Sequence, residues 1–447
     1  MSGGREVFPG PAASGDPELA TAVERKAARA FQRVTATAFG PYQSAIVRIG
    51  FGTTWLAFLL FEFPNRHALY GPDGPWDWQL GYELLADNDA FTGLLWTDSA
   101  FWFEAVYALS ALSSLLLVLG WRTRAASALF MFGVLSLQNR SVFVGDGGDN
   151  VVHLMAIYLV LTRCASVWSL DARRAARAER DGPVRDVAGP VLWGVLGAGL
   201  FTGTLLNETG ELVLWLFWLL WSVQGLWWLV TRYAPGGQHR LALDVVANLV
   251  HNTALLVIMA EVCLIYATAG WYKVQGSRWQ DGTALYYPLN LEYFTPWPAV
   301  SELLAASGLL VLVLTYGTVL VQVAFPFTLF NRKVKNVLLV IMIMEHAGIA
   351  VLLGLPFFSL AMISADAVFL PTVFLVWLGA RAAGLREGLL RRLPSRRRGG
   401  GCEGGAAAAS VPAPRAAEAP FGGTGGQADP GRADGAEGSG PGRTLVG

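Results

Sequence analysis

Charged residues are scarce in this chain of 447 residues. Asp, Glu, Lys and Arg make up 15% of it, whereas hydrophobic residues make up 53%, and 17 tryptophans are present. A soluble domain needs more charge than this to cover its surface, so the composition indicates a protein of the lipid bilayer. The 33 basic and 33 acidic residues balance, so the sequence predicts no net attraction to nucleic acid.

Cysteine and lysine are also rare. The three cysteines, Cys164, Cys263 and Cys402, form no CxxC motif and no spaced cluster. The sequence therefore predicts neither a disulfide framework nor a metal site. Only four lysines occur, and one of them, Lys273, stands at the end of a long apolar stretch.

Long apolar runs, by contrast, are abundant. A bilayer core about 30 Å thick is crossed by about 20 apolar helical residues. Stretches that meet or nearly meet this length predict an all-α, polytopic transmembrane helix bundle of about ten spans. They are 44–63, 101–119, 125–143, 151–168, 190–206, 212–231, 246–270, 302–325, 334–354 and 357–378. Alternatively, the fifth and sixth stretches form a re-entrant pair.

The basic residues near the span ends predict the orientation, because Lys and Arg are retained on the cytoplasmic side. The N-terminal segment and alternate loops contain 24 basic residues. The intervening loops contain only four, which are Arg66, Arg140, Lys273 and Arg278. This asymmetry predicts that both termini are cytoplasmic and that Lys273 lies on the outer side.

Composition divides the chain into three regions. Residues 1–43 are predicted to be a cytoplasmic segment with an amphipathic helix at 19–39, and residues 44–380 the transmembrane domain. Gly, Ala and Pro dominate residues 394–447. This tail has too little apolar area to offset its ordering entropy, so it is predicted to be disordered and cytoplasmic.

Ionisable side chains are few inside the apolar spans, where they are costly. Arg48 and Arg163 lie near cytoplasmic ends, from which their long side chains reach the interface. Glu345 and His346 lie about halfway along a span, so neither reaches water without a cavity. Helix pairing and a functional role both fit that position.

Lys273 has two interpretations. Tyr266, Gly270 and Lys273 follow i, i+4, i+7 spacing and share one helix face, and Gly270 would let a helix or ligand approach closely. If that face is turned inward, the amine would act as a general base. Alternatively, the lysine anchors the helix at the lipid headgroups together with Trp271 and Tyr272, and spacing alone favours this anchor.

Three segments resemble a known family. "YATAGWYKVQGSRWQDGTALYY" (266–287) and "LQNRSVFVGDGGDNVVHLMAIYLVLTRCASVWSLD" (137–171) are similar to two signatures of the HTTM domain. "MEHAGIAVLLGLPFFSLAMISADAVFLP" (344–371) is similar to its later histidine-containing span. HTTM is the membrane domain of vitamin K-dependent γ-glutamyl carboxylase. The domain also occurs in many bacterial proteins of unknown activity, including some that resemble a membrane protein used to mature a sporulation-delaying peptide toxin.

The resemblance implies a site chemistry. In the carboxylase, a lysine in the motif AG-x-x-K deprotonates reduced vitamin K, and oxygenation yields a base strong enough to remove a γ-proton from glutamate before CO2 adds. The matching catalytic residues here are Lys273, His153 and His346. The residues expected to bind the reduced quinone, of the vitamin K or menaquinol type, are Tyr266, Gly270, Arg278 and Trp279.

The chain departs from the carboxylase in two ways, since it has no cysteine pair for the lumenal disulfide and a tail instead of the folded substrate-binding segment. Our first hypothesis is therefore a quinol-dependent enzyme of the plasma membrane that modifies a small peptide or molecule at an outward-opening site. The second is a non-enzymatic maturation, export or immunity partner of a small secreted peptide. A third, a transporter with Glu345 and His346 as a proton relay, lacks an inverted repeat.

Overall fold

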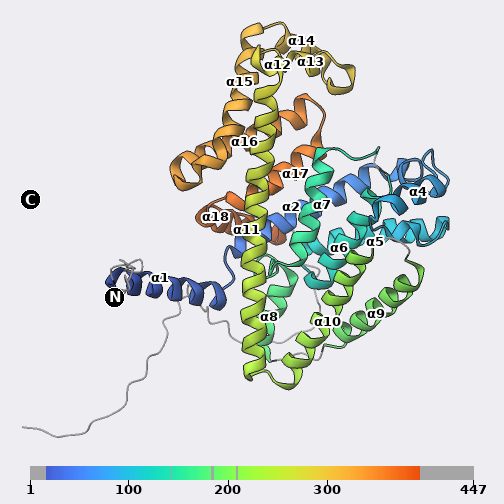
Figure 1. Ribbon diagram of the computed structural model, residues 1–447, viewed down its shortest axis with the longest axis vertical. Helices are drawn as coiled ribbons and strands as arrows, with labels where there is room; N and C mark the ends of the chain where they lie inside the picture. The colour runs from blue at the N-terminus through green and yellow to red at the C-terminus, as the bar shows by residue number, and fades with distance from the viewer. Residues whose placement is uncertain (1–16, 142, 183–185, 208–209, 393–447) are drawn as a thin grey trace, which may run out of the picture. The chain divides into compact units, whose positions relative to one another are not determined.

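The computed structural model describes residues 17–141, 143–182, 186–207 and 210–392, so the tail 394–447 lies outside the described residues. The chain divides into two units, Met1–Leu390 and Arg391–Gly447, and the structure below is that of the first. Every regular element in the described ranges is helical, which confirms the all-α prediction (Figure 1).

The helices of the described ranges follow one another with short connections. In chain order they are α1 (Pro17–Ala36), α2 (Pro41–Phe61), η1 (Phe63–Asn65), α3 (Arg66–Tyr70), α4 (Trp78–Asn88), η2 (Gly93–Trp96), α5 (Ala100–Leu119), α6 (Thr123–Gln138), α7 (Gly147–Val160), α8 (Leu170–Asp181), α9 (Ala188–Leu206), α10 (Glu211–Tyr233), α11 (Gln238–Gln275), α12 (Ser277–Gln280), α13 (Tyr286–Leu289), η3 (Glu292–Phe294), α14 (Pro298–Ala305), α15 (Gly308–Ala324), η4 (Phe325–Phe330), α16 (Arg332–Leu352), α17 (Pro356–Asp366), η5 (Ala367–Phe369) and α18 (Thr372–Arg392).

Seven of the described helices are long and apolar enough to cross a membrane, as the helices of an integral membrane protein must be. They are α2, α5, α9, α10, α11, α16 and the segment Gly308–Phe330 that α15 begins. The bent pair Pro356–Phe369 and Thr372–Gly388 makes an eighth if it is one span. The predicted count of about ten is not reached by this measure.

Three predicted spans account for the difference. The stretch 125–143 overlaps α6, which has 16 residues, and 151–168 overlaps α7, which has 14. Helix α7 ends at Val160 because a backbone N–H beyond it bonds to a side chain and not to the helix. Arg163 N donates to His251 Nδ1 at 2.9 Å. The stretch 357–378 is bent by 117° where Pro371 holds the preceding residue in an extended conformation.

Helices α9 and α10 are two separate helices of 19 and 23 residues. Gly210 starts α10 with a φ of 70°, a left-handed conformation that glycine adopts readily. The two helices contact each other through the stacked rings of Trp193 and Trp221, whose centroids are 4.0 Å apart. Each is long enough to cross a bilayer, which favours two spans over the re-entrant pair.

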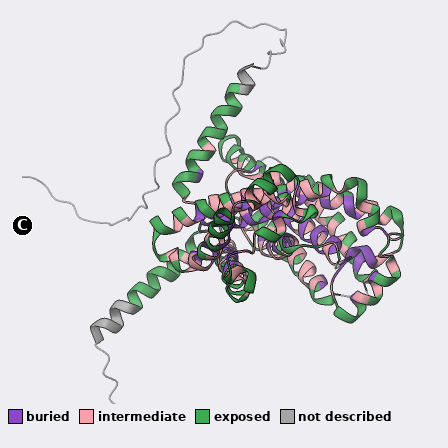
Figure 2. Ribbon diagram, turned by 90° about the horizontal axis from the view of Figure 1, so that it is seen from above, coloured by how far each residue is buried: buried purple, intermediate pink, exposed green. Residues whose placement is uncertain are grey.

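The core forms around α2. This helix packs against α5 and α17, and α6 packs against α5 and α7. Phe51, Trp55 and Leu59 of α2 are fully or almost fully buried. Figure 2 shows buried residues gathered in the middle of this group of helices. Helices α9 and α10 bury only 6% and 11% of their apolar windows, so most of their surface faces outward.

Helix α11 is a long helix against which several other elements pack, as Figure 1 shows. Its 38 residues extend about 57 Å at 1.5 Å per residue, which is more than a bilayer core needs. Near its N-terminal half, Asn248 and Asn252 donate to backbone oxygens of α1 and the following turn. Its C-terminal half packs against α15 and the 3-10 helix η4.

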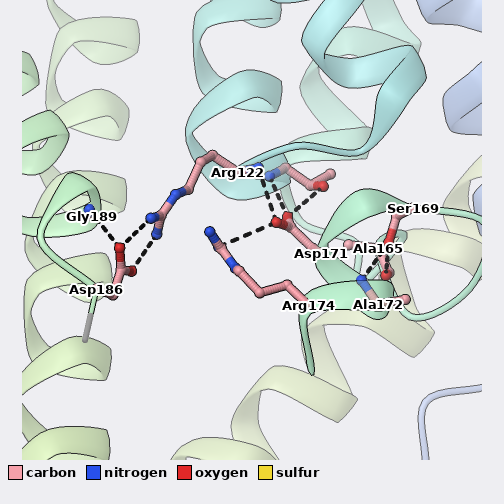
Figure 3. Close-up of polar contacts among 9 residues, drawn as sticks. Arg122, Ala165, Ser169, Asp171, Ala172, Arg174, Asp186 and Gly189 are labelled. Carbon is pink, nitrogen blue, oxygen red and sulfur yellow. Dashed lines mark hydrogen bonds and ion pairs between the residues drawn. The ribbon is translucent and has the colours of Figure 1, made fainter. Parts of the chain in front are cut away.

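The acidic residue Asp171 links the starts of helices α6 and α8, as Figure 3 shows. Asp171 of α8 accepts hydrogen bonds from Arg122 N at 3.1 Å and Thr123 N at 2.8 Å, so it caps α6. The Arg122 guanidinium donates to both oxygens of Asp186, which also accepts from Gly189 N at the start of α9. This cluster of Arg122, Asp171 and Asp186 connects α6, α8 and α9.

Candidate functional site

A chain of three polar side chains crosses the helices around the end of α11. Lys273 Nζ donates to Gln322 Oε1 of α15 at 2.6 Å. Gln322 Nε2 in turn donates to Glu345 Oε1 of α16 at 2.7 Å. Since an amine at this distance donates and a carboxylate accepts, the two neighbours determine which end of the Gln322 amide faces each of them. Gln322 is 5% exposed, so the bridge lies inside the bundle.

A second polar group lies two helical turns earlier on α11. The Tyr266 hydroxyl contacts His346 Nε2 of α16 and donates to Asp366 Oδ2 of α17, both at 3.0 Å. All three residues are at most 2% exposed. Because Tyr266 and Lys273 belong to α11, and Glu345 and His346 are neighbours on α16, the two groups occupy one region of the structure.

Two atoms of this second group have no hydrogen-bond partner among the described residues. They are His346 Nδ1 and Asp366 Oδ1, both buried. Rings surround them, because His346 packs against Phe358 at 5.7 Å and Tyr266 against Phe325 at 5.9 Å between centroids. A buried polar atom without a partner is costly, and such atoms mark places where a bound group completes the bonding.

The structure brings together three of the residues predicted from sequence, Lys273, His346 and Tyr266. Gly270 lies between the two polar groups on α11, but its open face meets α15: a Cβ there would lie 2.7 Å from Val323 Cγ2. Gly270 therefore allows two helices to approach, and that position is not open to a ligand. Trp279 stands beside the amine, with its ring centroid 5.3 Å from Lys273 Nζ.

Arg278 and His153 have other partners. Arg278 is exposed, forms an ion pair of 3.6 Å with Asp281 and lies over the ring of Tyr287. Hydrogen bonds from Thr283, together with Arg278, hold the pKa of Asp281 below its ordinary value. His153 Nδ1 lies 3.2 Å from Gln138 Oε1 on α6. No contact found in the described ranges joins His153 or Arg278 to Lys273 or His346.

Two members of the site were missed from sequence. Gln322 is a single amide in an apolar run, a pattern that ordinary helix pairing also produces. Asp366 is a single acidic residue in an apolar segment, and only the hydrogen bond from Tyr266 shows that it belongs to this group. The described residues contain no cluster of His, Cys, Asp and Glu that could hold a metal ion.

Two hollows of the described part of the chain lie among the segments that follow α2. One is lined by residues that include Tyr70, Trp78 and Arg140, and the other by the segment around His67 and Gly74. Neither includes Lys273 or His346. Lys273, Gln322 and Glu345 are hydrogen-bonded to one another.

Comparison with known proteins assigns no family. No family model matches the chain, and no solved structure matches it. The uncharacterized protein YitO of Bacillus subtilis is 32% identical over 110 residues, which are 24% of this chain and 35% of that protein. The chain thus matches about a third of the length of this relative.

Proposed function

We propose that the protein is an integral membrane enzyme, similar to the HTTM family, in which Lys273 is the base that acts on a reduced quinone. The observation that carries the proposal is the direction of the amine. Lys273 Nζ donates to Gln322 inside the bundle, whereas an interfacial anchor would extend to the headgroups. An inward lysine at a helix end is costly without a function or a partner charge.

The residues present fit a reduced quinone. Among the described residues, the buried His346 Nδ1 and Asp366 Oδ1 have no hydrogen-bond partner, and the rings of Phe358 and Phe325 pack against His346 and Tyr266, which suits an apolar ring that carries hydroxyl groups. Trp279 supplies a flat ring beside the amine. When bound, a reduced quinone would supply two electrons and an acidic hydroxyl.

Three side chains, those of Lys273, Gln322 and Glu345, act in the proposed proton transfer. Lys273 Nζ accepts the hydroxyl proton and becomes an ammonium. The carbonyl oxygen of Gln322 accepts a hydrogen bond from the amine, and the amide nitrogen of Gln322 donates one to Glu345. A negative Glu345 stabilises the new ammonium through this bridge, because charges interact strongly away from water. Gln322 and Glu345 act here as positioning residues.

The proposal includes an orientation with both termini in the cytoplasm and the end of α11 on the outer side of the plasma membrane. The basic-residue asymmetry supports it. The short helices α6 and α7 do not change the side on which Lys273 is predicted to lie. If neither helix crosses the membrane, the number of crossings before Lys273 falls by two, which leaves its side the same. Eight crossings, with the bent pair α17–α18 as the last, then preserve the same orientation for Lys273.

A turnover assay tests the proposal. Full-length protein in detergent would receive menaquinol or vitamin K hydroquinone with oxygen, and the quinone epoxide would be measured. We expect epoxide from wild type, and about 100-fold less from Lys273→Gln. Lys333→Gln is the matched control, since Lys333 is exposed at the start of α16.

Folding of each variant would be checked by size-exclusion chromatography and circular dichroism. If correctly folded wild type forms no epoxide from either quinol, the enzyme proposal is wrong. The alternative for the same protein is then the non-enzymatic partner of a small secreted peptide.

A further inference from the structure

Arg140 is a buried arginine that lies in the loop between α6 and α7. It is 1% exposed. Its Nη2 donates to the backbone oxygens of Trp76 at 2.9 Å and Gly71 at 3.3 Å. Its Nη1 is buried and has no acceptor among the described residues. None of the ion pairs found in the described ranges includes Arg140. A buried charge without a counter-charge is strongly unfavourable.

Arg48 shows how this protein satisfies a buried arginine in another way. It is 0% exposed, so the expectation that its side chain reaches the interface is wrong, and it is also absent from the ion pairs of the described residues. However, its Nε donates to Cys164 O at 3.2 Å, its Nη1 to Val118 O at 2.9 Å and its Nη2 to Trp168 O at 2.9 Å. Every nitrogen of Arg48 therefore has an acceptor, and Arg140 differs in having a spare donor.

Two indole groups near Arg140 have the same defect. Trp76 Nε1 and Trp78 Nε1 are buried and lack acceptors in the described part of the chain. A Cβ added to Gly81 of α4 would overlap Arg140 Nη1 and lie 3.6 Å from Trp76 Nε1. The guanidinium and the Trp76 indole therefore meet over the same glycine. Asp77 is the acid whose charge acts on Arg140, but no ion pair of the described residues joins the two, and Asp77 accepts from Leu80 N at 2.9 Å at the start of α4.

A hollow adjoins Arg140 and Trp78, whereas Trp76 is not among the residues that line it. It is lined by Arg140 and Trp78, by the rings of Tyr70 and Phe103, and by Thr97 and Ser99. Its cavity volume is about 10 Å³, about enough for one group the size of a water molecule. Only a small group fits.

We propose that this hollow binds a small monovalent anion, either a halide ion or a single carboxylate group. The unpartnered groups are all N–H donors, one of them carries a positive charge, and the available space is small. An anion would accept from Arg140 Nη1 and from the indole of Trp78, and it would neutralise the buried guanidinium. The site would fasten the segment 70–103 to the end of α6.

Thermal unfolding tests the proposal. The full-length protein in detergent would be titrated with sodium chloride, formate or acetate against sodium isethionate at constant ionic strength. We expect a saturable rise in Tm of at least about 2 °C with one or more of the three anions. A rise with chloride alone identifies a halide site, and a rise with formate or acetate identifies a carboxylate site.

Arg140→Gln should abolish the anion-dependent rise. Arg66→Gln should retain it, because Arg66 already pairs with Glu104 at 2.8 Å. A rise that does not saturate, or that persists in Arg140→Gln, contradicts the proposal.

A second measurement does not depend on a variant that folds. Crystals of wild-type protein grown in bromide should show an anomalous peak beside Arg140 Nη1. An ordered water alone at that position, together with no Tm response, would overturn the proposal.

Discussion

The amine of Lys273 and the amide oxygen of Gln322 lie 2.6 Å apart, although 49 residues separate them along the chain. This contact joins the end of α11 to α15 and continues through Gln322 to Glu345 on α16. It distinguishes the two interpretations of Lys273, because a headgroup anchor needs no partner inside the bundle. The contact is also the basis of the proposed chemistry.

Gln322→Leu should destabilise the protein. The leucine can form neither hydrogen bond, so Lys273 and Glu345 lose their common partner while still partly buried. We expect a loss of about 1–3 kcal/mol in the free energy of unfolding, measured by chemical denaturation in detergent. The control is Gln275→Leu at the exposed end of α11, where a change within about 0.5 kcal/mol is expected. Equal stability of the two variants would show that the bridge is absent.

Gly133→Ala should disrupt the contact between α5 and α6. A Cβ on Gly133 would lie 2.6 Å from Ser110 Cβ and 2.9 Å from Ser110 Cα, so the helices would have to separate. We expect a loss of about 1–3 kcal/mol, typical of overpacking. The matched change is Gly194→Ala on α9, where nothing lies within 4 Å of the added methyl group. There, alanine should stabilise the helix by about 0.5–1 kcal/mol. The experiment compares the Tm of the two variants, and a lower Tm for Gly194→Ala would contradict the packing described here.

The Arg122–Asp186 ion pair should make stability depend on pH in the acid range. Hydrogen bonds from Arg122 hold the pKa of Asp186 at about 2, below its ordinary value of 3.8. A lowered pKa means that the pair stabilises the folded state above about pH 4 and that this contribution is lost as the pH falls towards 2. The side chain of Asp186 is 43% exposed, so the contribution should be below about 1 kcal/mol.

The measurement for this ion pair is the difference in Tm between wild type and Asp186→Asn at pH 6 and at pH 3. We expect the difference to shrink at pH 3. Asp181→Asn, at the exposed end of α8, serves as the control and should show little difference at either pH. A difference for Asp186→Asn that is the same at both pH values would refute the assignment.

The proposed orientation predicts opposite accessibility at two exposed arginines. In a Cys402→Ser background, Arg278→Cys should react with a membrane-impermeant maleimide in intact cells. Arg332→Cys, at the start of α16, should react only after the membrane is permeabilised. The readout is the mass shift of the labelled protein on a gel. Labelling of both positions from the same side would contradict the topology.

Much of the helical framework was predictable from apolar runs. The stretches 44–63 and 101–119 correspond closely to α2 and α5, because helices of that length and composition need no tertiary context to be recognised. The ends of α7 and the bend after α17 were not predicted. They depend on partners distant in sequence, such as the contact of Arg163 with His251, and on the local effect of Pro371.

The site was predictable only in part. Periodicity placed Tyr266 and Lys273 on one face of a helix, but it does not say which way that face is turned. The direction follows from Gln322 and Asp366, which reach the same region from α15 and α17. A pattern within one helix contains no information on such contacts.

An experimental structure of the full-length protein in lipid nanodiscs tests the central claim most directly, because it shows where the amine of Lys273 lies when lipid is present. We predict density that places Lys273 Nζ within hydrogen-bond distance of Gln322 Oε1, and Gln322 within hydrogen-bond distance of Glu345, inside the helix bundle. Density that carries the Lys273 side chain outward to the phosphate groups of the lipids, with Gln322 bonded elsewhere, would contradict the account.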